Sequence, residues 1–292
     1  MQSSTTQQPP LHDSTMAPHT VGGAEPSTDS AYKYKLELKT VQSSIIRIMI
    51  EALKEILPDT NIEFSPAGIR IITMDLSHTV LVHLRLDGTQ FEHYHCPEKM
   101  VVGLNMLNLF KLVKTMNNNE TLTLYIEHTD PSRLGIRIEN GEKNTVTNFK
   151  LNMLDLDEEE IEVPPAQFSS VINIPSTDFQ KICRDMANLA SLIEIKSVDN
   201  QLIFTCQGDF AQQETIMGES SSNGISYVEK QNAYDIIQGV FSLKHLVLFT
   251  KCTNLCNSIQ MFLENDYPLI IAYQVGSLGE VKFCLAPKKV QS

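Results

Sequence analysis

The sequence has no tryptophan and too few basic residues to bind a polyanion through its overall charge. Its 23 lysine and arginine residues are outnumbered by 35 aspartate and glutamate residues, so the formal net charge is −12 at pH 7. Proteins that hold nucleic acid by neutralising its phosphates are normally basic. The chain therefore either does not contact nucleic acid or holds it in a way that needs only a locally positive surface.

Long apolar segments are also missing. No apolar run approaches the roughly 20 residues that a membrane-spanning helix needs, and the N-terminus lacks the basic start and apolar core of a secretory signal. We therefore expect no membrane partner. The few cysteines stand in apolar contexts, which is typical of reduced thiols in a protein core; they are Cys96, Cys183, Cys206, Cys252, Cys256 and Cys284.

Motifs for catalysis are absent. There is no glycine-rich phosphate loop, no HExxH and no paired CxxC, and Cys252 with Cys256 lacks a second pair of zinc ligands. Asp75 with His78 would be an acid–base pair in an enzyme, but a histidine in a turn is the simpler interpretation. The acidic residues Asp155, Asp157, Glu158 and Glu159 would be metal ligands in a nuclease, but a solvated linker explains them. We expect no enzyme, no catalytic residue, no metal and no cofactor.

The composition divides the chain into five parts. The first 31 residues are rich in serine, threonine, glutamine and proline, so they cannot bury enough apolar area to offset the entropy of ordering. An acidic stretch that ends in two prolines marks an exposed connector in the middle of the chain. The predicted parts are a disordered extension (1–31), a first domain (32–150), the connector (151–165), a second domain (166–289) and a short tail (290–292).

The two predicted domains repeat one plan. Helices are expected from Ser44 to about Leu57 and from Asn105 to Met116, between strands with period-two alternation. Further helices are expected to begin at Ser176 and Ser242, about 135 residues later. Apolar positions match at nearly the same offset in both helix pairs, which indicates an internal duplication. The predicted fold class is α+β, with two similar domains that each pack two helices on antiparallel sheets.

Basic residues gather on these four helices. Charged outer faces are ordinary for a single amphipathic helix, but all four share the feature in a chain that is acidic overall, with few acids close by. This segregation predicts one positive surface, suited to the backbone of duplex DNA. The DNA-facing candidates are Arg47, Lys54, Lys111, Lys114, Lys181, Arg184, Lys244 and Lys251.

The sequence resembles the proliferating cell nuclear antigen family of sliding clamps. The resemblance runs from about Tyr34 to Lys289. It is carried by matching segments that follow one another in the same order as in the family, among them Val41–Arg47, Met74–His78, Leu154–Asp157 and Leu285–Lys288. It implies a DNA clamp fold in which three subunits join head to tail as a homotrimer around double-stranded DNA, with the helices lining the hole. It also implies that edge strands pair between subunits, here about Arg133 to Glu139 with Ala211 to Glu219.

The resemblance further implies a groove in which DNA polymerase and other client proteins dock a short peptide. Carried over residue by residue, the partner-peptide groove comprises Met74, His78, Leu81, Ile161, Val163, Pro164, Pro268, Cys284, Ala286 and Pro287. Cys284 stands where the family has a tyrosine, so the wall of the groove loses an aromatic ring. A clamp loader of the replication factor C type would open the ring. The expected location is the nucleus, or the viral replication compartment if the source is a virus.

Two other hypotheses about the function stay open at this point. One is a subunit of a heterotrimeric damage-checkpoint clamp, which would assemble with different chains. The other is an adaptor that binds peptides but never encircles DNA, for which neutralising the helix lysines would change nothing.

Overall fold

The computed structural model describes residues 33–157, 161, 166–220, 224–230 and 235–289; the predicted N-terminal extension and C-terminal tail lie outside the described residues. The helices are α1 (Ser43–Ile56), α2 (Met106–Val113), α3 (Ser176–Ala187) and α4 (Leu243–Phe249), with 3-10 turns η2 (Gly88–Gln90) and η3 (Thr250–Leu255). The strands of the first half are β1 (Tyr34–Thr40), β2 (Asp59–Ser65), β3 (Gly68–Met74), β4 (Val80–Asp87), β5 (His93–His95), β6 (Met100–Asn105), β7 (Thr121–Glu127), β8 (Asp130–Asn140) and β9 (Thr145–Asn152). Those of the second half are β10 (Ser170–Pro175), β11 (Leu192–Val198), β12 (Gln201–Gln207), β13 (Gln212–Gly218), β14 (Ser226–Lys230), β15 (Ile237–Ser242), β16 (Ser258–Leu263), β17 (Leu269–Val275) and β18 (Gly279–Leu285).

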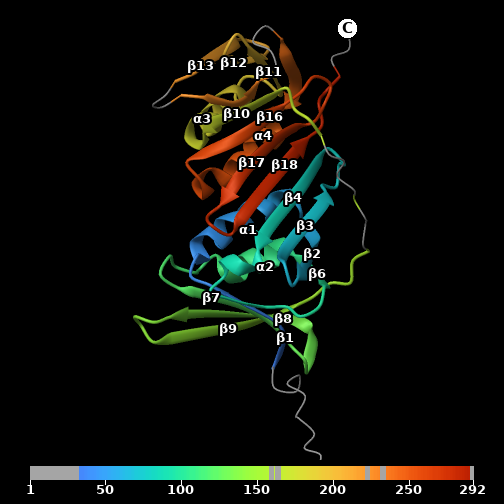
Figure 1. The fold of residues 1–292 in the computed structure, drawn as a ribbon, viewed down its shortest axis with the longest axis vertical. Coiled ribbons are helices and arrows are strands. Elements are labelled where there is room, and N and C mark those ends of the chain that lie inside the picture. The colour runs from blue at the N-terminus through green and yellow to red at the C-terminus, as the bar shows by residue number, and fades with distance from the viewer. Residues whose placement is uncertain (1–32, 158–160, 162–165, 221–223, 231–234, 290–292) are drawn as a thin grey trace, which may run out of the picture. The chain divides into compact units, whose positions relative to one another are not determined.

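The strands form three antiparallel sheets (Figure 1). One has the order β5-β1-β7-β8-β9, and one has the order β13-β12-β11-β15. The third, of nine strands, has the order β14-β10-β16-β17-β18-β4-β3-β2-β6. At its centre β18 pairs with β4, so strands of the two halves of the chain join there. The α+β class with antiparallel sheets, predicted from the sequence, is confirmed.

The strand pairing also confirms the internal duplication. The order β5-β1-β7-β8-β9 in the first half recurs as β14-β10-β16-β17-β18 in the second. Likewise β4-β3-β2-β6 recurs as β13-β12-β11-β15. Each strand of one half therefore has an equivalent in the other, and the equivalent of a strand residue can be read from the registers.

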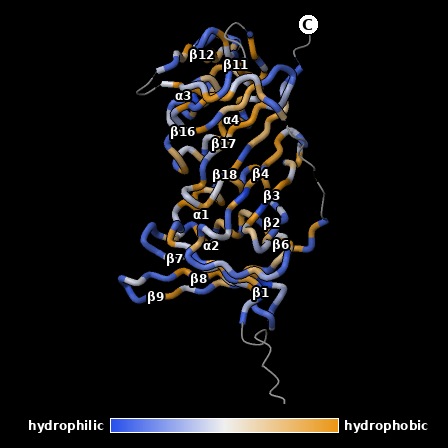
Figure 2. The backbone as a smooth tube through the Cα atoms, in the orientation of Figure 1, coloured by the Kyte–Doolittle hydropathy of each residue, from blue (hydrophilic) through white to orange (hydrophobic). Residues whose placement is uncertain are grey.

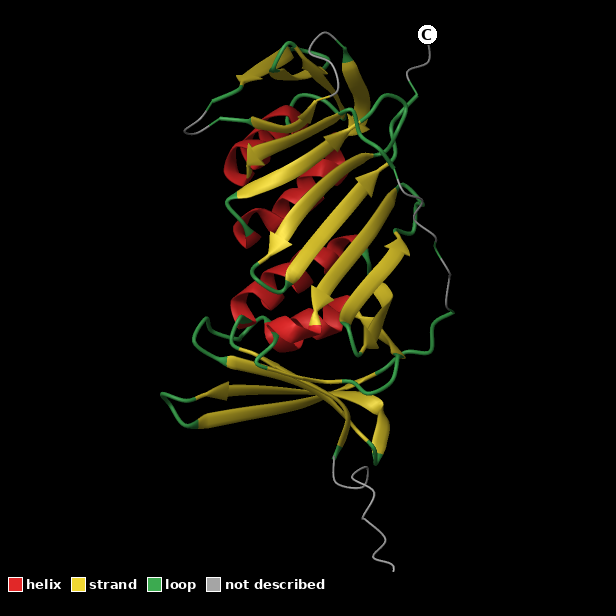
Figure 3. Cartoon of the chain, viewed as in Figure 1, coloured by secondary structure: helices red, strands yellow, loops and turns green. Residues whose placement is uncertain are grey.

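The four helices lie on one side of the nine-stranded sheet (Figure 3). Neighbouring helices touch in the order α2–α1–α4–α3, and η3 extends α4 along α1. Each helix buries a stripe of apolar residues spaced three or four apart. In α1 the buried apolar residues are Ile46, Met49, Ile50, Ala52, Leu53 and Ile56, and in α3 they are Phe179, Ile182, Cys183 and Met186. Along the strands, hydrophobic and hydrophilic residues alternate (Figure 2), as expected for sheets with one covered face.

Large aromatic side chains fill the core behind α4. Phe249 stacks on Phe283 with ring centroids 4.7 Å apart, and Tyr273 meets Phe283 edge-on at 6.2 Å. Tyr273 is fully buried, yet its hydroxyl has no hydrogen-bond partner among the described residues. A buried polar group without a partner is destabilising because it has lost its bonds to water.

We therefore expect Tyr273→Phe to leave the free energy of unfolding unchanged or to raise it by about 1 kcal/mol, because it removes only the unpaired hydroxyl. Urea denaturation measures the change. The matched control is Tyr94→Phe, since the Tyr94 hydroxyl donates to the carbonyl of Ser65 at 2.8 Å. That control should lose about 1 kcal/mol. A larger loss in Tyr273→Phe than in the control would contradict the prediction.

Candidate DNA-facing surface and partner groove

The predicted DNA-facing residues lie in the helix layer or directly after it. Arg47 and Lys54 are on α1, Lys111 and Lys114 are at the end of α2, Lys181 and Arg184 are on α3, Lys244 is on α4 and Lys251 is in η3. Six of the eight are exposed, and Arg47 and Lys54 are half-buried. Since the helices bury their apolar stripes toward the sheets, the exposed cations project from the opposite side of the layer.

Two of these cations are partly neutralised by one acid. Glu55 accepts from the Nζ atoms of Lys54 at 2.5 Å and Lys251 at 3.0 Å. These hydrogen bonds lower the pKa of the Glu55 carboxyl, so it stays ionised between the two lysines. Lys54 also lies 4.8 Å from the centroid of the Phe110 ring, an aromatic contact among the basic residues that sequence reasoning missed.

Arg47 is held by the protein itself. Its Nη1 donates to the carbonyl of Met116 at 2.7 Å and its Nη2 donates to Oδ1 of Asn118 at 3.3 Å. These bonds tie α1 to the turn after α2. The remaining five cations have no ion pair with the described residues. They are Lys111, Lys114, Lys181, Arg184 and Lys244.

Residues of the predicted groove lie on three adjacent strands. Met74 at the end of β3 pairs with Leu81 of β4, and Leu81 pairs with Cys284 of β18. All three side chains are half-buried. The β3, β4 and β18 strands therefore place these residues side by side on one sheet.

The loop between β3 and β4 carries His78 and is held by Asp75. The Asp75 carboxylate accepts from the backbone amides of Thr79 at 2.8 Å and Val80 at 2.7 Å. Partial burial opposes ionisation of Asp75, but hydrogen bonds from Ser77, Val80 and Thr79 lower its pKa overall. His78 has φ +50°, the left-handed conformation of a tight turn. Asp75 thus anchors the loop through both of its carboxylate oxygens.

The other groove candidates border this surface. The amide of Ala286 donates to the carbonyl of Thr79 at 3.0 Å, which brings Ala286 and Pro287 beside the β3–β4 loop. Pro268 precedes β17, whose first residue pairs with Leu285. Ile161 is half-buried, whereas Val163 and Pro164 lie outside the described residues.

The described part of the connector runs along β6. Leu154 forms an antiparallel bridge with Gly103, and its amide donates to the Gly103 carbonyl at 2.8 Å. The side chain of Asn61 donates to the carbonyls of Leu156 at 3.4 Å and Asp157 at 3.1 Å. The connector thus covers the outer edge of β6 before it reaches the residues that the structure does not describe, among them the acidic Glu158 and Glu159.

The side chains that the structure describes do not form a metal site. Among these residues, no group of three or more histidine, cysteine or acidic side chains is arranged to hold a metal ion. Cys252 is buried, and desolvation raises the pKa of its thiol, so the thiolate that zinc needs is disfavoured. None of the described helices is long and apolar enough to cross a membrane.

One sequence expectation about the sheet edges is wrong. Arg133 to Glu139 was expected at an edge, but β8 pairs with β7 on one side and with β9 on the other. The edge strand is β9, whose residues line up with those of β18 at an offset of 134. The same duplication that aligned the helices could have identified it.

Among the described strands, β9 and β13 are the long edges without cover. The outer side of β6 meets the connector, and the outer side of β15 receives a hydrogen bond from the Lys288 amide to the Val240 carbonyl at 2.8 Å. The other edge strands, β5 and β14, have three and five residues, whereas β9 has eight and β13 has seven. A long exposed edge strand has unpaired backbone N–H and C=O groups that can pair with a strand of another chain.

Comparisons with known proteins agree with this architecture. The family model for the N-terminal domain of proliferating cell nuclear antigen matches residues 35–161, and the model for its C-terminal domain matches residues 162–288. A curated relative from Paramecium bursaria Chlorella virus 1, described as a probable DNA polymerase sliding clamp, is 37% identical over 254 residues, which are 86% of this chain and 95% of the relative. The proliferating cell nuclear antigen of Chaetomium thermophilum is 29% identical over 259 residues, which are 87% of this chain and 98% of the relative. With both domain models matched in order over nearly all of the described residues, this chain belongs to the proliferating cell nuclear antigen family of sliding clamps.

Proposed function

We propose that this chain is the subunit of a homotrimeric sliding clamp, a non-enzymatic ring that encircles duplex DNA and tethers DNA polymerase and other client proteins to it. The family membership and the viral and fungal relatives support this function. The ring itself does no bond-making chemistry. It would hold DNA by topology, which is compatible with a net charge of −12 as long as the inner surface is positive.

The observation that supports the ring is that the two free edge strands are the equivalents of two strands that pair with each other inside the chain. Inside the chain β4 pairs with β18. The duplication makes β13 the equivalent of β4 and β9 the equivalent of β18. A second copy that repeats this joint would pair its β13 with β9 of the first, and repetition of a head-to-tail contact generates a ring when the rotation closes.

The registers give the expected pairing in detail. In the internal pair, Glu280 lies opposite Arg85. The equivalent residues on the free edges are Val146 of β9 and Ile216 of β13. Their side chains are 55% and 54% exposed, and the proposed pairing would place them opposite each other. This complementarity within one sequence favours a homotrimer over a checkpoint clamp of different chains.

The proposed DNA-facing surface is the exposed side of the helix layer. Its five cations without ion pairs would contact phosphates, while Lys54 and Lys251 are held back by Glu55. The proposed client site is the surface around Met74, Leu81 and Cys284. A clamp loader of the replication factor C type would open the ring, and the clamp would act in the nucleus or in a viral replication compartment.

We expect Glu55→Gln to strengthen duplex binding, because it removes one negative charge per subunit and releases Lys54 and Lys251 toward the phosphates. Each additional phosphate contact steepens the dependence of log Kd on log salt by about 0.9. Fluorescence anisotropy with a labelled duplex, titrated at several salt concentrations, measures both quantities. Glu229→Gln on β14 is the control for the loss of one exposed acid elsewhere. Equal effects of the two substitutions would contradict the special role of Glu55.

The experiment that tests the proposed function has two stages. Light scattering of the purified protein at micromolar concentration should give a mass of three times 32.8 kDa. The clamp should then be retained on nicked circular DNA after loading, and it should slide off once the circle is cut. A monomer at every concentration would reject the homotrimer, and retention on the cut DNA would reject topological binding.

A further inference from the structure

The duplication allows the contact between the two halves of the chain to be compared with the proposed contact between two copies. Some positions that are apolar in the first contact are polar in the second, and a cavity beside β9 lies among them. The pairing of β4 with β18, together with the packing of α1 against α4 and η3, forms an internal joint between the two halves of the chain. The external joint is the proposed equivalent between two copies, with β13 and α3 of one copy against β9 and α2 of the next. The inference therefore rests on the proposed ring.

At three positions of α1 the internal joint is apolar, although Gln42 beside them hydrogen-bonds to Ser277 in the β17–β18 turn. On α1, Ile45 and Ile48 pack against the core, and Ala52 is fully buried. Ile45 lies against the turn between β17 and β18, with its Cδ1 3.4 Å from the position that a Cβ atom on Gly276 would take. Position 45 of α1 therefore meets this turn.

The helix that would take this place in the external joint carries charges instead. The offset of 133 residues between α1 and α3 replaces Ile45 by Asp178 and Ala52 by Asp185. Asp178 lies in the first turn of α3, and Asp185 is exposed. A charged stripe of this kind needs polar partners when it is covered.

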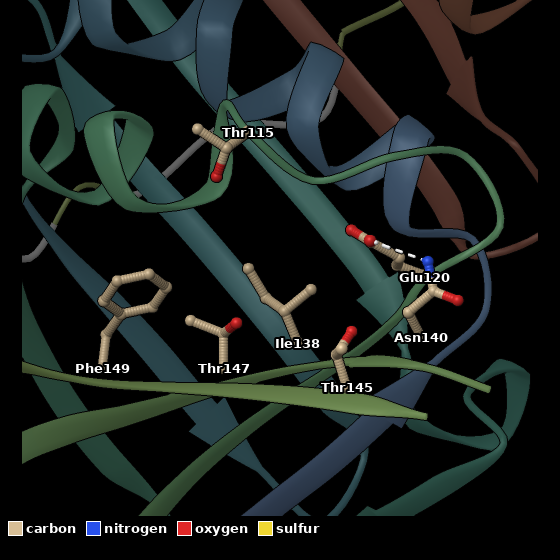
Figure 4. A pocket seen from close by; sticks show the side chains of 7 residues that line it. All are labelled: Thr115, Glu120, Ile138, Asn140, Thr145, Thr147 and Phe149. Carbon is tan, nitrogen blue, oxygen red and sulfur yellow. Dashed lines mark hydrogen bonds between the residues drawn. The ribbon is translucent and has the colours of Figure 1, made fainter. Parts of the chain in front are cut away.

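The receiving side of the external joint is a polar cavity. It holds about 110 Å³ and is lined by Thr115, Glu120, Ile138, Asn140, Thr145, Thr147 and Phe149. In Figure 4 these side chains converge from the turn after α2 and from β8 and β9.

Two equivalent positions in the internal joint are apolar and buried. The register of β17 and β18 replaces Asn140 by Val275 and Thr147 by Val281. Both valines are completely buried. The cavity is thus the place where an external joint would receive a side chain, and its threonine and asparagine groups suit a polar one.

We propose that this cavity receives Asp178 of a neighbouring copy. The turn that corresponds to Gly276 begins at Gly141, directly after Asn140 of the cavity. Lys143 follows in the same turn, and its amide donates to Oδ1 of Asn140 at 3.0 Å, which holds the turn at the rim of the cavity. The carboxylate of Asp178 would accept from the hydroxyl groups of Thr145 or Thr147 and pair with Lys143.

The receiving side also carries acids, so the attraction for Asp178 rests on Lys143 and on the hydroxyl groups of the cavity. Glu120 already accepts from the amide of Asn117 at 2.8 Å and from the side chain of Asn140 at 3.1 Å, which directs its carboxylate toward its own chain, and these bonds lower its pKa so that it stays ionised. Glu142 lies on the exposed turn itself. In a single chain α3 and β9 lie at opposite ends of the helix layer (Figure 1), so Asp178 and Lys143 can meet only between copies.

A charge-swap experiment on the trimer tests this contact. Asp178→Lys and Lys143→Asp are each expected to raise the trimer dissociation concentration by about tenfold at 0.1 M salt, because like charges then face each other at every external joint. The double variant restores the pair with reversed polarity and should return to within about threefold of the wild type. Analytical ultracentrifugation over a concentration series measures the dissociation.

The controls separate this inference from the proposed ring. Glu229→Lys makes the same charge change on the exposed part of β14 and should leave the dissociation unchanged. Thermal unfolding of each variant checks that the fold is intact. Additive effects in the double variant, or no effect of Asp178→Lys on a wild-type trimer, would overturn the proposed contact and leave the ring standing. A wild-type protein that stays monomeric at every concentration would overturn both.

Discussion

The double variant Val146→Lys with Ile216→Lys is expected to be monomeric at micromolar concentration, where the wild-type ring is a trimer. The two substitutions remove an apolar cross-strand pair and place like charges opposite each other, which should destabilise each joint by about 2 kcal/mol. A ring has three such joints, so the total of about 6 kcal/mol shifts the association constant by about four orders of magnitude. Light scattering of the double variant measures the mass directly.

Two further variants make this result specific to the proposed pairing. Val146→Glu combined with Ile216→Lys should restore the trimer, because the pair then attracts across the joint. Val228→Lys is the matched control, since Val228 is 51% exposed on β14, which belongs neither to the sheet of β9 nor to that of β13. A trimer that survives the double lysine variant, or a control that dissociates as readily, would show that β9 and β13 do not form the joint.

Removal of Lys111 and Lys114 is expected to have the second large effect. The variant Lys111→Ala with Lys114→Ala removes six exposed cations from a trimer, and none of them is neutralised by an ion pair within the described residues. Duplex affinity should fall at least about tenfold at low salt, and the slope of log Kd against log salt should become shallower by about 0.9 for each phosphate that the variant no longer neutralises. The trimer mass and the binding of a client peptide should not change.

The control for this pair lies outside the helices. Lys196 alternates with the buried residues of β11 and so projects from the face opposite the helices, and Lys289 is exposed near the C-terminus. Lys196→Ala with Lys289→Ala makes the same change in net charge. If both double variants weaken DNA binding equally, the helix layer has no special role and the adaptor hypothesis regains support. Loss of the trimer in Lys111→Ala with Lys114→Ala would also argue against a DNA role for these lysines.

The periodicity of the sequence was sufficient to predict the helices and the duplication. The apolar stripe of α1, from Ile46 to Ile56, repeats in α3 because both helices cover sheets with one face, and burial of such a stripe permits few alternatives. The basic residues could be assigned to the exposed sides of the helices for the same reason. These properties depend on residues that are close together in the chain, so they can be predicted from the local sequence pattern.

Only the tertiary structure showed which side chains contact each other and which strands lie at the edges of the sheets. Glu55 and Lys251 are almost 200 residues apart in the sequence, and only the packing of α1 against η3 brings them to 3.0 Å. The edge position of β9 is likewise a property of the whole sheet, because each strand of an antiparallel ladder has two sides and the chain alone does not say which side stays open. The sequence by itself thus determined the elements, their repetition and the sign of the helix surface. Their long-range contacts decided which cations are held by an acid and which edges are left for another copy, since these depend on distances that only the folded chain defines.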